Sequence, residues 1–158
     1  MSGPERPTAI QPTGIFEGLR PTAILLGVVF DNLATYLVGS LLLLAFAGPP
    51  GSDGAFDENA LAALASSREF LLASLAGGLA CTASGAFVGA RRAGCHFVRH
   101  GAWIGVCAAL IGLACYPAPA ASRPLPPLWF DLAGYALLLP AGALGGLLAT
   151  LGAARHRA

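Results

Sequence analysis

Asp31 is the residue whose type and position could do chemistry, because its carboxyl lies inside a long apolar stretch of this 158-residue chain. It follows Arg20 by eleven residues, about 16 Å along a helix, which would bring it near the centre of a hydrocarbon layer about 30 Å thick. An Asp at that depth costs about 2.5 to 3.5 kcal/mol, so it must be protonated, paired with a polar group or open to a wet cavity. Asn32 and Thr35 accompany it, and Thr35 lies one turn further along the same helix face, where its hydroxyl can donate to the carboxyl.

Two interpretations of Asp31 stay open. In the functional one, the carboxyl relays a proton or another cation, or anchors the polar part of a ligand. In the structural one, a neutral carboxyl forms a hydrogen bond across a helix bundle, to a backbone carbonyl or to a hydroxyl of the second apolar stretch. The candidate hydroxyls there are those of Ser74, Thr82 and Ser84.

Asp131 is the other carboxylate that lies clearly inside an apolar stretch. It sits near the start of that stretch beside Trp129, where aromatic belts and first-turn acids are ordinary at a membrane surface, so we expect a structural role. Pro140 in the same stretch should bend a helix and free the carbonyl of Ala136, giving a hinge or a polar spot at lipid depth.

Cys95, His96 and His100 form the one cluster with metal-ligand spacing, because the two histidines are four residues apart and would share a helix face. Three arginines surround the cluster: Arg91, Arg92 and Arg99. Their charge opposes a divalent cation and no nearby carboxylate completes a ligand set. We therefore expect neither a metal nor another cofactor, but a basic turn that contacts anionic lipid head groups.

Four apolar stretches must position these residues. Hydrophobic residues make up 56% of the chain and charged residues 11%, against about 25% charged in soluble domains. The stretches are continuously apolar, whereas membrane strands alternate and need only about ten residues, so helices are predicted. The expected fold is an all-α membrane protein with a four-transmembrane-helix bundle. Its predicted parts are an N-terminal cytoplasmic segment 1–20, a transmembrane domain 21–154 with spans at about 21–47, 66–90, 97–116 and 128–154, and a cytoplasmic tail 155–158.

Two helix starts can be predicted from local patterns. Ser66 to Glu69 has the form of a capping box, in which a Ser hydroxyl and a Glu three residues later bond the free amides of a helix start. In the loop before it, Asp57 should cap a short surface helix with Leu61 and Leu64 on one face.

The arginines predict the orientation, because basic residues near span ends are retained on the cytoplasmic side. Seven fall on one side of the four spans: Arg6, Arg20, Arg91, Arg92, Arg99, Arg155 and Arg157. The other side has only Arg68 and Arg123. Both termini should therefore be cytoplasmic. The first stretch is too long for the apolar core of a signal peptide, so we expect it to remain as an anchor.

Small residues recur every four positions on three of the spans, and such rows let helix backbones approach closely in lipid. The predicted helix-packing residues are Gly77, Gly78, Gly85, Gly89, Gly101, Gly105, Gly142 and Gly146. The rows could pack within one bundle, between chains, or both. A disrupted assembly is expected for Gly85→Leu or Gly146→Leu if they mediate an oligomer.

A faint internal repeat relates the second span to the fourth. Gly77-Gly78-Leu79, with Thr82 and the arginine pair that follows, matches Gly145-Gly146-Leu147, with Thr150 and the arginines that follow, at an offset of 68 residues. Two duplicated helical hairpins in parallel orientation are therefore possible, as occur in some transporters.

Several segments together resemble small four-span bacterial inner-membrane proteins of uncharacterised function. They are residues 27–35 (GVVFDNLAT), 77–78 (GG), 85–92 (GAFVGARR) and 100–102 (HGA). The resemblance implies a helical bundle in a bacterial inner membrane and brings no activity with it.

Two classes of function stay open. A non-enzymatic structural or accessory subunit is favoured, packing against a second copy or another membrane protein and against membrane lipid. The alternative is a small oligomeric transporter or channel that uses Asp31. An enzyme is not expected, because no nucleophile, base and orienting group converge on one face. The net charge of +1 argues against a nucleic-acid partner.

Overall fold

The computed structural model describes residues 14, 16–52, 54–115 and 126–155. Within them the chain forms five α-helices and no strand: α1 (Pro21–Ala47), α2 (Glu58–Ser66), α3 (Arg68–Ala93), α4 (Phe97–Ala114) and α5 (Leu128–Arg155). All except the short α2 are long and apolar enough to cross a membrane. The chain is therefore, by the length and composition of its helices, an all-α multi-pass membrane protein, which confirms the predicted fold class.

Some of the predicted features lie outside the described residues. They are the predicted span end at Tyr116, most of the linker that follows it, the first thirteen residues, and Arg6, Arg123 and Arg157.

The surface helix before the second span is present as α2. Asp57 caps it, since its carboxylate accepts a hydrogen bond from the backbone N–H of Asn59 at 2.9 Å. The two leucines do not share one environment: Leu64 is buried, whereas Leu61 is 38% exposed.

The cap of α3 is Ser67 and not Ser66, which corrects the predicted register. The Ser67 hydroxyl accepts from the N–H of Phe70 at 3.3 Å and donates to the Glu69 carboxylate at 3.1 Å. Ser66 belongs to α2, where its hydroxyl donates to the carbonyl of Ala63. An N-cap needs an extended backbone, and Ser67, with φ −72° and ψ 119°, is the one residue between the two helices.

The turn between α3 and α4 lies further along the chain than predicted. The helix continues through Arg91 and Arg92 to Ala93, and Gly94 ends it with a φ of 71°, in the left-handed conformation that glycine adopts without strain. His96 is also left-handed, with a φ of 44°, and α4 begins directly after it.

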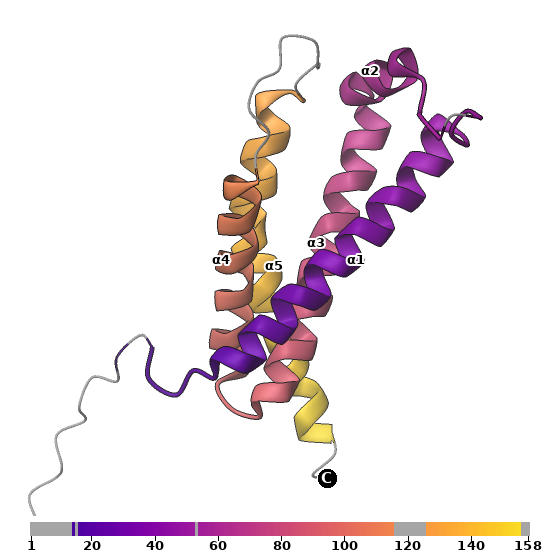
Figure 1. The fold of residues 1–158 in the computed structure, drawn as a ribbon. Helices are drawn as coiled ribbons and strands as arrows, with labels where there is room; N and C mark the ends of the chain where they lie inside the picture. The colour runs from indigo at the N-terminus through magenta and orange to yellow at the C-terminus, as the bar shows by residue number, and fades with distance from the viewer. Residues whose placement is uncertain (1–13, 15, 53, 116–125, 156–158) are drawn as a thin grey trace, which may run out of the picture.

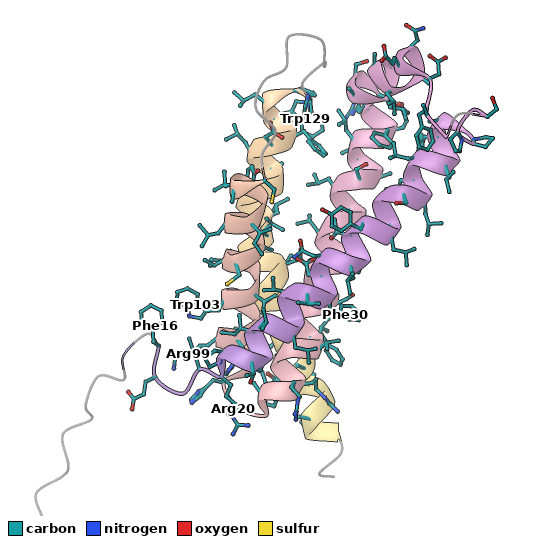
Figure 2. The ribbon with its side chains drawn as sticks, viewed as in Figure 1. Phe16, Arg20, Phe30, Arg99, Trp103 and Trp129 are labelled. Atoms are coloured by element: carbon teal, nitrogen blue, oxygen red, sulfur yellow. The ribbon has the colours of Figure 1, made fainter. Side chains whose placement is uncertain are left out.

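The four spans form two hairpins, α1 with α3 and α4 with α5 (Figure 1). The start of α1, the α3–α4 turn and the end of α5 lie together, and we call this the arginine end because Arg20, Arg91, Arg92 and Arg99 belong to it. The opposite end, which we call the α2 end, carries α2 and the start of α5. Figure 2 shows Arg20 and Arg99 at one end and Trp129 at the other.

The two helices of the first hairpin, α1 and α3, do not contact the second hairpin in the same way. Helix α3 packs against α4 and α5, and α1 packs against α4, but α1 and α5 make no close contact within the described residues. If a two-fold axis related the hairpins, the α3–α4 contact would have a counterpart between α1 and α5. The parallel arrangement of α3 and α5 agrees with the predicted repeat, whereas the contacts do not follow its symmetry (Figure 1). Duplication itself stays a prediction.

The core lies toward the arginine end. It centres on Val28 of α1, Ala86 of α3 and Ile104 of α4, with Ile24 and Cys107 packed against it. Outward-facing positions are apolar: Phe30 on α1, for example, is 42% exposed and points away from the bundle (Figure 2). Such a surface suits lipid better than water.

Seven of the eight predicted packing glycines lie against another helix. A Cβ on Gly85 would come within 2.6 Å of the Gly27 carbonyl of α1, and one on Gly105 within 3.0 Å of the Leu138 backbone of α5. Gly78 differs, because a Cβ there would meet nothing within 4 Å. The small rows are therefore used inside the chain, with one open position.

Candidate functional site

Asp31 is 4% exposed and lies on the face of α1 that packs against α3. The Thr82 hydroxyl of α3 donates to its Oδ1 atom at 3.0 Å. The Thr35 hydroxyl, one turn away on α1, lies 3.5 Å from the same oxygen, at the outer limit of a hydrogen bond. Of the hydroxyls that the sequence left open, Thr82 is thus the partner across the bundle, while Ser84 donates to the carbonyl of Ala80 within its own helix.

Two glycines explain why Thr82 can reach Asp31. Gly27 and Gly85 face one another where α1 crosses α3, and a Cβ on Gly85 would lie 2.9 Å from the Asp31 Cβ. Thr82 is three residues before Gly85, on the adjoining face of α3. The close approach of the two backbones therefore brings the carboxyl and the hydroxyl together.

The two carboxyl oxygens of Asp31 differ. Oδ1 accepts both threonine contacts, whereas Oδ2 makes no hydrogen bond with any described residue. No buried side-chain nitrogen or oxygen in the described part of the chain lacks a partner. Oδ2 is therefore not sealed from the surface. The Thr82 hydroxyl, in turn, is also 3.2 Å from the carbonyl of Gly78.

Asn32 does not join this site. Its side-chain amide donates to the carbonyl of Val28 at 2.8 Å, one turn earlier on α1. The structure thus brings Asp31 and Thr35 together, as the sequence indicated, and places Asn32 on a neighbouring face. Thr82 was one alternative among several, since the sequence does not fix which α3 residue meets α1.

A cleft of about 360 Å³ lies next to the site, between α1, α3 and α5. It exists because α1 and α5 do not meet there. The residues that line it are Thr35, Ser74, Leu75, Gly78, Leu79, Phe130, Asp131, Gly134, Tyr135 and Leu138. The residues from the starts of α3 and α5 place its outer part toward the α2 end. Thr35 lines the cleft and contacts the carboxyl, and Gly78 lies one turn from Thr82, so the inner part of the cleft comes within one helical turn of Asp31.

Asp131 was predicted to be structural, and it lies in the first turn of α5. Its side chain also lines the outer part of the cleft, with Tyr135 one turn deeper. The cleft therefore has one polar side chain, Asp131, in its outer part and another, Tyr135, one turn deeper, while most of its other lining residues are apolar.

His100 is completely buried and uses both ring nitrogens. Nε2 accepts from the backbone N–H of Arg20 at 2.9 Å, and Nδ1 lies 3.1 Å from the carbonyl of His96. Because an amide must donate and a carbonyl must accept, the proton is on Nδ1 and the ring is neutral. This histidine fastens the start of α1 to α4, a role that the sequence did not reveal.

The cysteine and the other histidine near His100 also contact the segment before α1. The Cys95 thiol lies 3.8 Å from the Gly18 carbonyl, and a Cβ on Gly18 would lie 2.9 Å from the His96 ring. No group of three or more His, Cys, Asp or Glu side chains in the described residues is arranged to hold a metal ion.

The three arginines of the predicted lipid-contacting turn lie at the arginine end. Arg91 and Arg92 are exposed, and the Arg91 guanidinium lies 5.9 Å from the Phe87 ring centroid. Arg99 donates to the carbonyl of Gly14 at 3.0 Å. Contact with lipid head groups stays a prediction.

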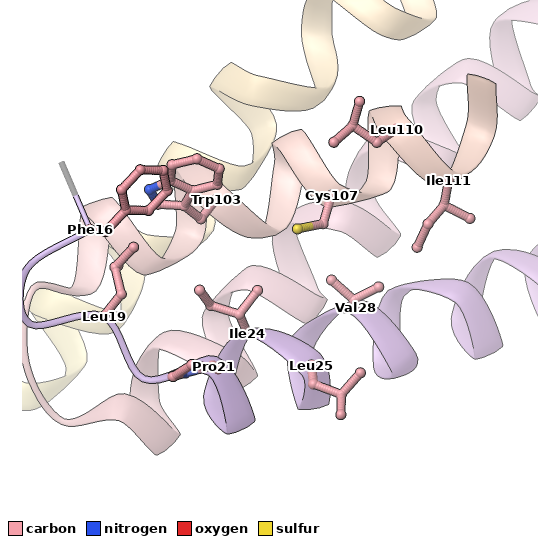
Figure 3. A pocket seen from close by; sticks show the side chains of 10 residues that line it. All are labelled: Phe16, Leu19, Pro21, Ile24, Leu25, Val28, Trp103, Cys107, Leu110 and Ile111. Atoms are coloured by element: carbon pink, nitrogen blue, oxygen red, sulfur yellow. The ribbon is translucent and has the colours of Figure 1, made fainter. Parts of the chain in front are cut away.

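A second and larger hollow, of about 610 Å³, lies between α1, α4 and the segment before α1 (Figure 3). Its lining is apolar apart from the Cys107 thiol and the Trp103 indole N–H, and the Phe16 and Trp103 rings meet at one end with centroids 5.1 Å apart. In a bilayer such a surface faces lipid tails.

The chemically distinctive feature is therefore the buried Asp31 carboxyl with its two threonines, of which Thr35 also lines the cleft. Searches for similar proteins found no matching family model, no matching curated protein and no matching solved structure.

Proposed function

We propose that the chain is a non-enzymatic accessory or structural subunit of a bacterial inner membrane, which receives a transmembrane helix of another subunit in the cleft between α1, α3 and α5. One observation carries this proposal: α1 and α5 both pack against α3 and make no close contact with one another. The space between them borders an apolar wall that another helix could cover.

The free small-residue surface supports a helix as the occupant. Ser74 and Gly78 are four residues apart on α3 and both line the cleft. Gly78 and, across the cleft, Gly134 have nothing within 4 Å of a Cβ position. Helices in lipid associate through close packing at such small-xxx-small pairs. The other small-residue rows already pack against helices of the same chain, so they are not available to a partner helix.

The distribution of arginines supports an orientation with both termini in the cytoplasm. Arg20, Arg91, Arg92 and Arg99 belong to the arginine end, whereas Arg68 starts α3 at the other end. Short connections rich in Arg are retained on the cytoplasmic side of a membrane. The cleft would then open toward the outside of the cell.

Gly78→Leu tests the proposed subunit contact. The new side chain would fill the cleft and should remove a partner, or a second copy, that co-purifies with the wild-type chain in mild detergent. Ala76→Leu is the matched control, because Ala76 is an exposed position on the same helix that does not line the cleft. A wild-type chain that purifies alone as a monomer, or an assembly that Gly78→Leu leaves intact, would contradict the proposal.

Differently tagged copies of the chain separate the two kinds of occupant. Recovery of one tag with the other indicates a second copy, and recovery of a single different membrane protein indicates a hetero-subunit. Gly85→Leu and Gly146→Leu do not suit this test, because both glycines pack within the chain and their substitution would disturb the bundle itself.

A second candidate function, an oligomeric transporter or channel that uses Asp31, is favoured by Thr35, which contacts the carboxyl and also lines the cleft. Ion or solute flux into liposomes containing the purified chain would test it. Flux that is absent, or that Asp31→Asn leaves unchanged, would reject this candidate.

A further inference from the structure

We infer that Asp31 is a proton-binding site whose Oδ2 atom exchanges its proton with water through the cleft from the α2 end. This inference rests on the second candidate function and names its ion. It requires a cleft that no partner helix fills, so it is an alternative to the proposed subunit contact.

The hydrogen bonds of the carboxyl indicate which oxygen carries the proton. Oδ1 accepts from Thr82 at 3.0 Å and from Thr35 at 3.5 Å. When the acid is neutral and Oδ1 accepts from both hydroxyls, Oδ1 is its carbonyl oxygen and the proton is on Oδ2. Oδ2 has no partner among the described residues although the side chain is 4% exposed. A proton on Oδ2 removes the charge that lipid depth disfavours.

Groups near Asp31 supply no positive charge that could replace a proton. On α3 the titratable neighbour is the buried Cys81 thiol, and on α4 the nearest such side chain of the adjoining core is Cys107. On α5 the cleft is lined by Asp131 and Tyr135, and no Arg or His is among its described lining residues. None of the described residues that line the cleft offers Asp31 a positive charge, and a proton is the simplest partner for the carboxyl.

The oxygen atoms around Asp31 also suit a proton better than a metal cation. Hard divalent cations take about six or more oxygen ligands. Beyond its own two oxygens, the carboxyl has near it the hydroxyls of Thr35 and Thr82, and the Gly78 carbonyl is already within 3.2 Å of the Thr82 hydroxyl. That set is too small for a divalent ion.

The packing of the helices lets water approach Asp31 from the α2 end and not from the arginine end. Toward the arginine end, Ala90, Ala93, His100 and Ile104 are completely buried. Toward the α2 end the neighbours of the carboxyl form the wall of the cleft, since Thr35 and Gly78 both line it. Water that enters the cleft is thus one helical turn from the site, whereas the other direction is closed by core residues.

Infrared difference spectroscopy on the full chain in lipid vesicles tests the protonation. The spectrum of the wild type minus that of Asp31→Asn should show the C=O stretch of a protonated carboxylic acid, and the band should shift when the vesicles are transferred to D₂O. Asp131→Asn is the matched control and should leave this band in place. A carboxylate band at position 31 at neutral pH, or an acid band that never shifts in D₂O, would overturn the inference.

A hydrophobic carbodiimide, dicyclohexylcarbodiimide, gives a second test, because it attaches to protonated carboxyl groups. Mass spectrometry should locate the adduct at Asp31, with labelling that decreases as the pH rises. Gly78→Leu should slow this labelling about tenfold by filling the cleft, whereas Ala76→Leu should not. If Gly78→Leu does not fold, Gly134→Leu closes the cleft from the α5 side.

The outcomes separate this site from the transport function. Labelling of Asp31 without liposome flux would retain the proton site and reject the transporter. Flux that requires Asp31, in a chain that shows no labelling of Asp31, would retain the transporter and reject the proton site. Labelling that NaCl suppresses at constant pH would overturn the proton as the ligand and point to Na⁺.

Discussion

A single carboxyl at membrane depth is tolerated here because its neighbours are hydroxyl groups. Thr82 donates to Asp31 from α3, and Gly27 and Gly85 let the two helices approach closely enough for that contact. The sequence allowed the prediction that the carboxyl needs a polar partner. It did not identify the partner, because the crossing point of α1 and α3 depends on the packing of both helices.

Asp31→Asn should leave the stability of the chain nearly unchanged, because an amide has almost the shape of a neutral carboxyl and keeps an oxygen for Thr82. Thr82→Val should cost about 0.5 to 1.5 kcal/mol, since it removes the stronger of the two contacts. Denaturation by SDS, followed by circular dichroism, would measure both. A larger loss for Asp31→Asn than for Thr82→Val would show that the carboxyl is charged in the folded chain.

His100→Ala should destabilise the chain by about 2 to 4 kcal/mol, because it opens a space in the core and leaves the Arg20 N–H without its acceptor. The peptide bond after the exposed Glu17 should also become more sensitive to a glutamate-specific protease, which would show that the segment before α1 is released. His96→Asn is the control, since His96 is exposed and Asn tolerates its left-handed backbone. Equal sensitivity to the glutamate-specific protease in both variants would contradict the role assigned to His100.

At the scale of the helices, the close approaches depend on glycine. A Cβ on Gly146 of α5 would lie 2.8 Å from the Val98 Cα of α4, and one on Gly142 would lie 3.0 Å from the Gly105 nitrogen. The sequence predicted which residues could allow such approaches. It did not predict that Gly78, in the same row as Thr82, would remain open, because this depends on α5 leaning away from α1 at the α2 end.

Gly146→Ala should lower the stability of the chain by about 1 to 3 kcal/mol, because the added methyl group meets backbone atoms that cannot move aside. Gly39→Ala should be neutral or slightly stabilising, since nothing lies within 4 Å of that position and alanine favours a helix. Thermal unfolding in one detergent would compare the two. A Gly146→Ala variant as stable as the wild type would show that the α4–α5 contact is looser in the membrane.

The N-caps of α2 and α3 show when a local sequence pattern is sufficient to predict where a helix begins and when it is not. The cap of α2 at Asp57 depends on one carboxylate and the backbone amide of Asn59, two residues further on, so the sequence predicts it correctly. The cap of α3 was assigned one residue early, because two adjacent serines can each cap a helix and only the end of α2 decides between them.

For the whole molecule, the four spans were predictable from the length and continuity of the apolar stretches. The unequal contacts between the two hairpins were not, because they arise from side-chain packing between segments that are distant in the sequence. Helix α3 contacts all four other helices, whereas α1 contacts α2, α3 and α4 but not α5.

The native cysteines allow the orientation to be tested. Cys95 lies at the arginine end, and Cys115 follows α4 near the other end, where it is exposed. In chains that retain one of the two, with the remaining cysteines changed to Ala, a membrane-impermeant maleimide added to intact cells should label Cys115. Cys95 should react only after the cells are opened. The opposite pattern would reverse the proposed orientation and place the cleft on the cytoplasmic side.

The hydrogen bond between Arg20 and His100 joins residues 80 positions apart. During synthesis, the first span therefore leaves the ribosome long before the side chain that fastens its beginning has been made. Until α4 is inserted, α1 has α3 as its main partner and its start is unfastened. The segment before α1 can pack against the α3–α4 turn only at that later stage, so truncated nascent chains that stop short of α4 would leave it accessible to proteases and chaperones.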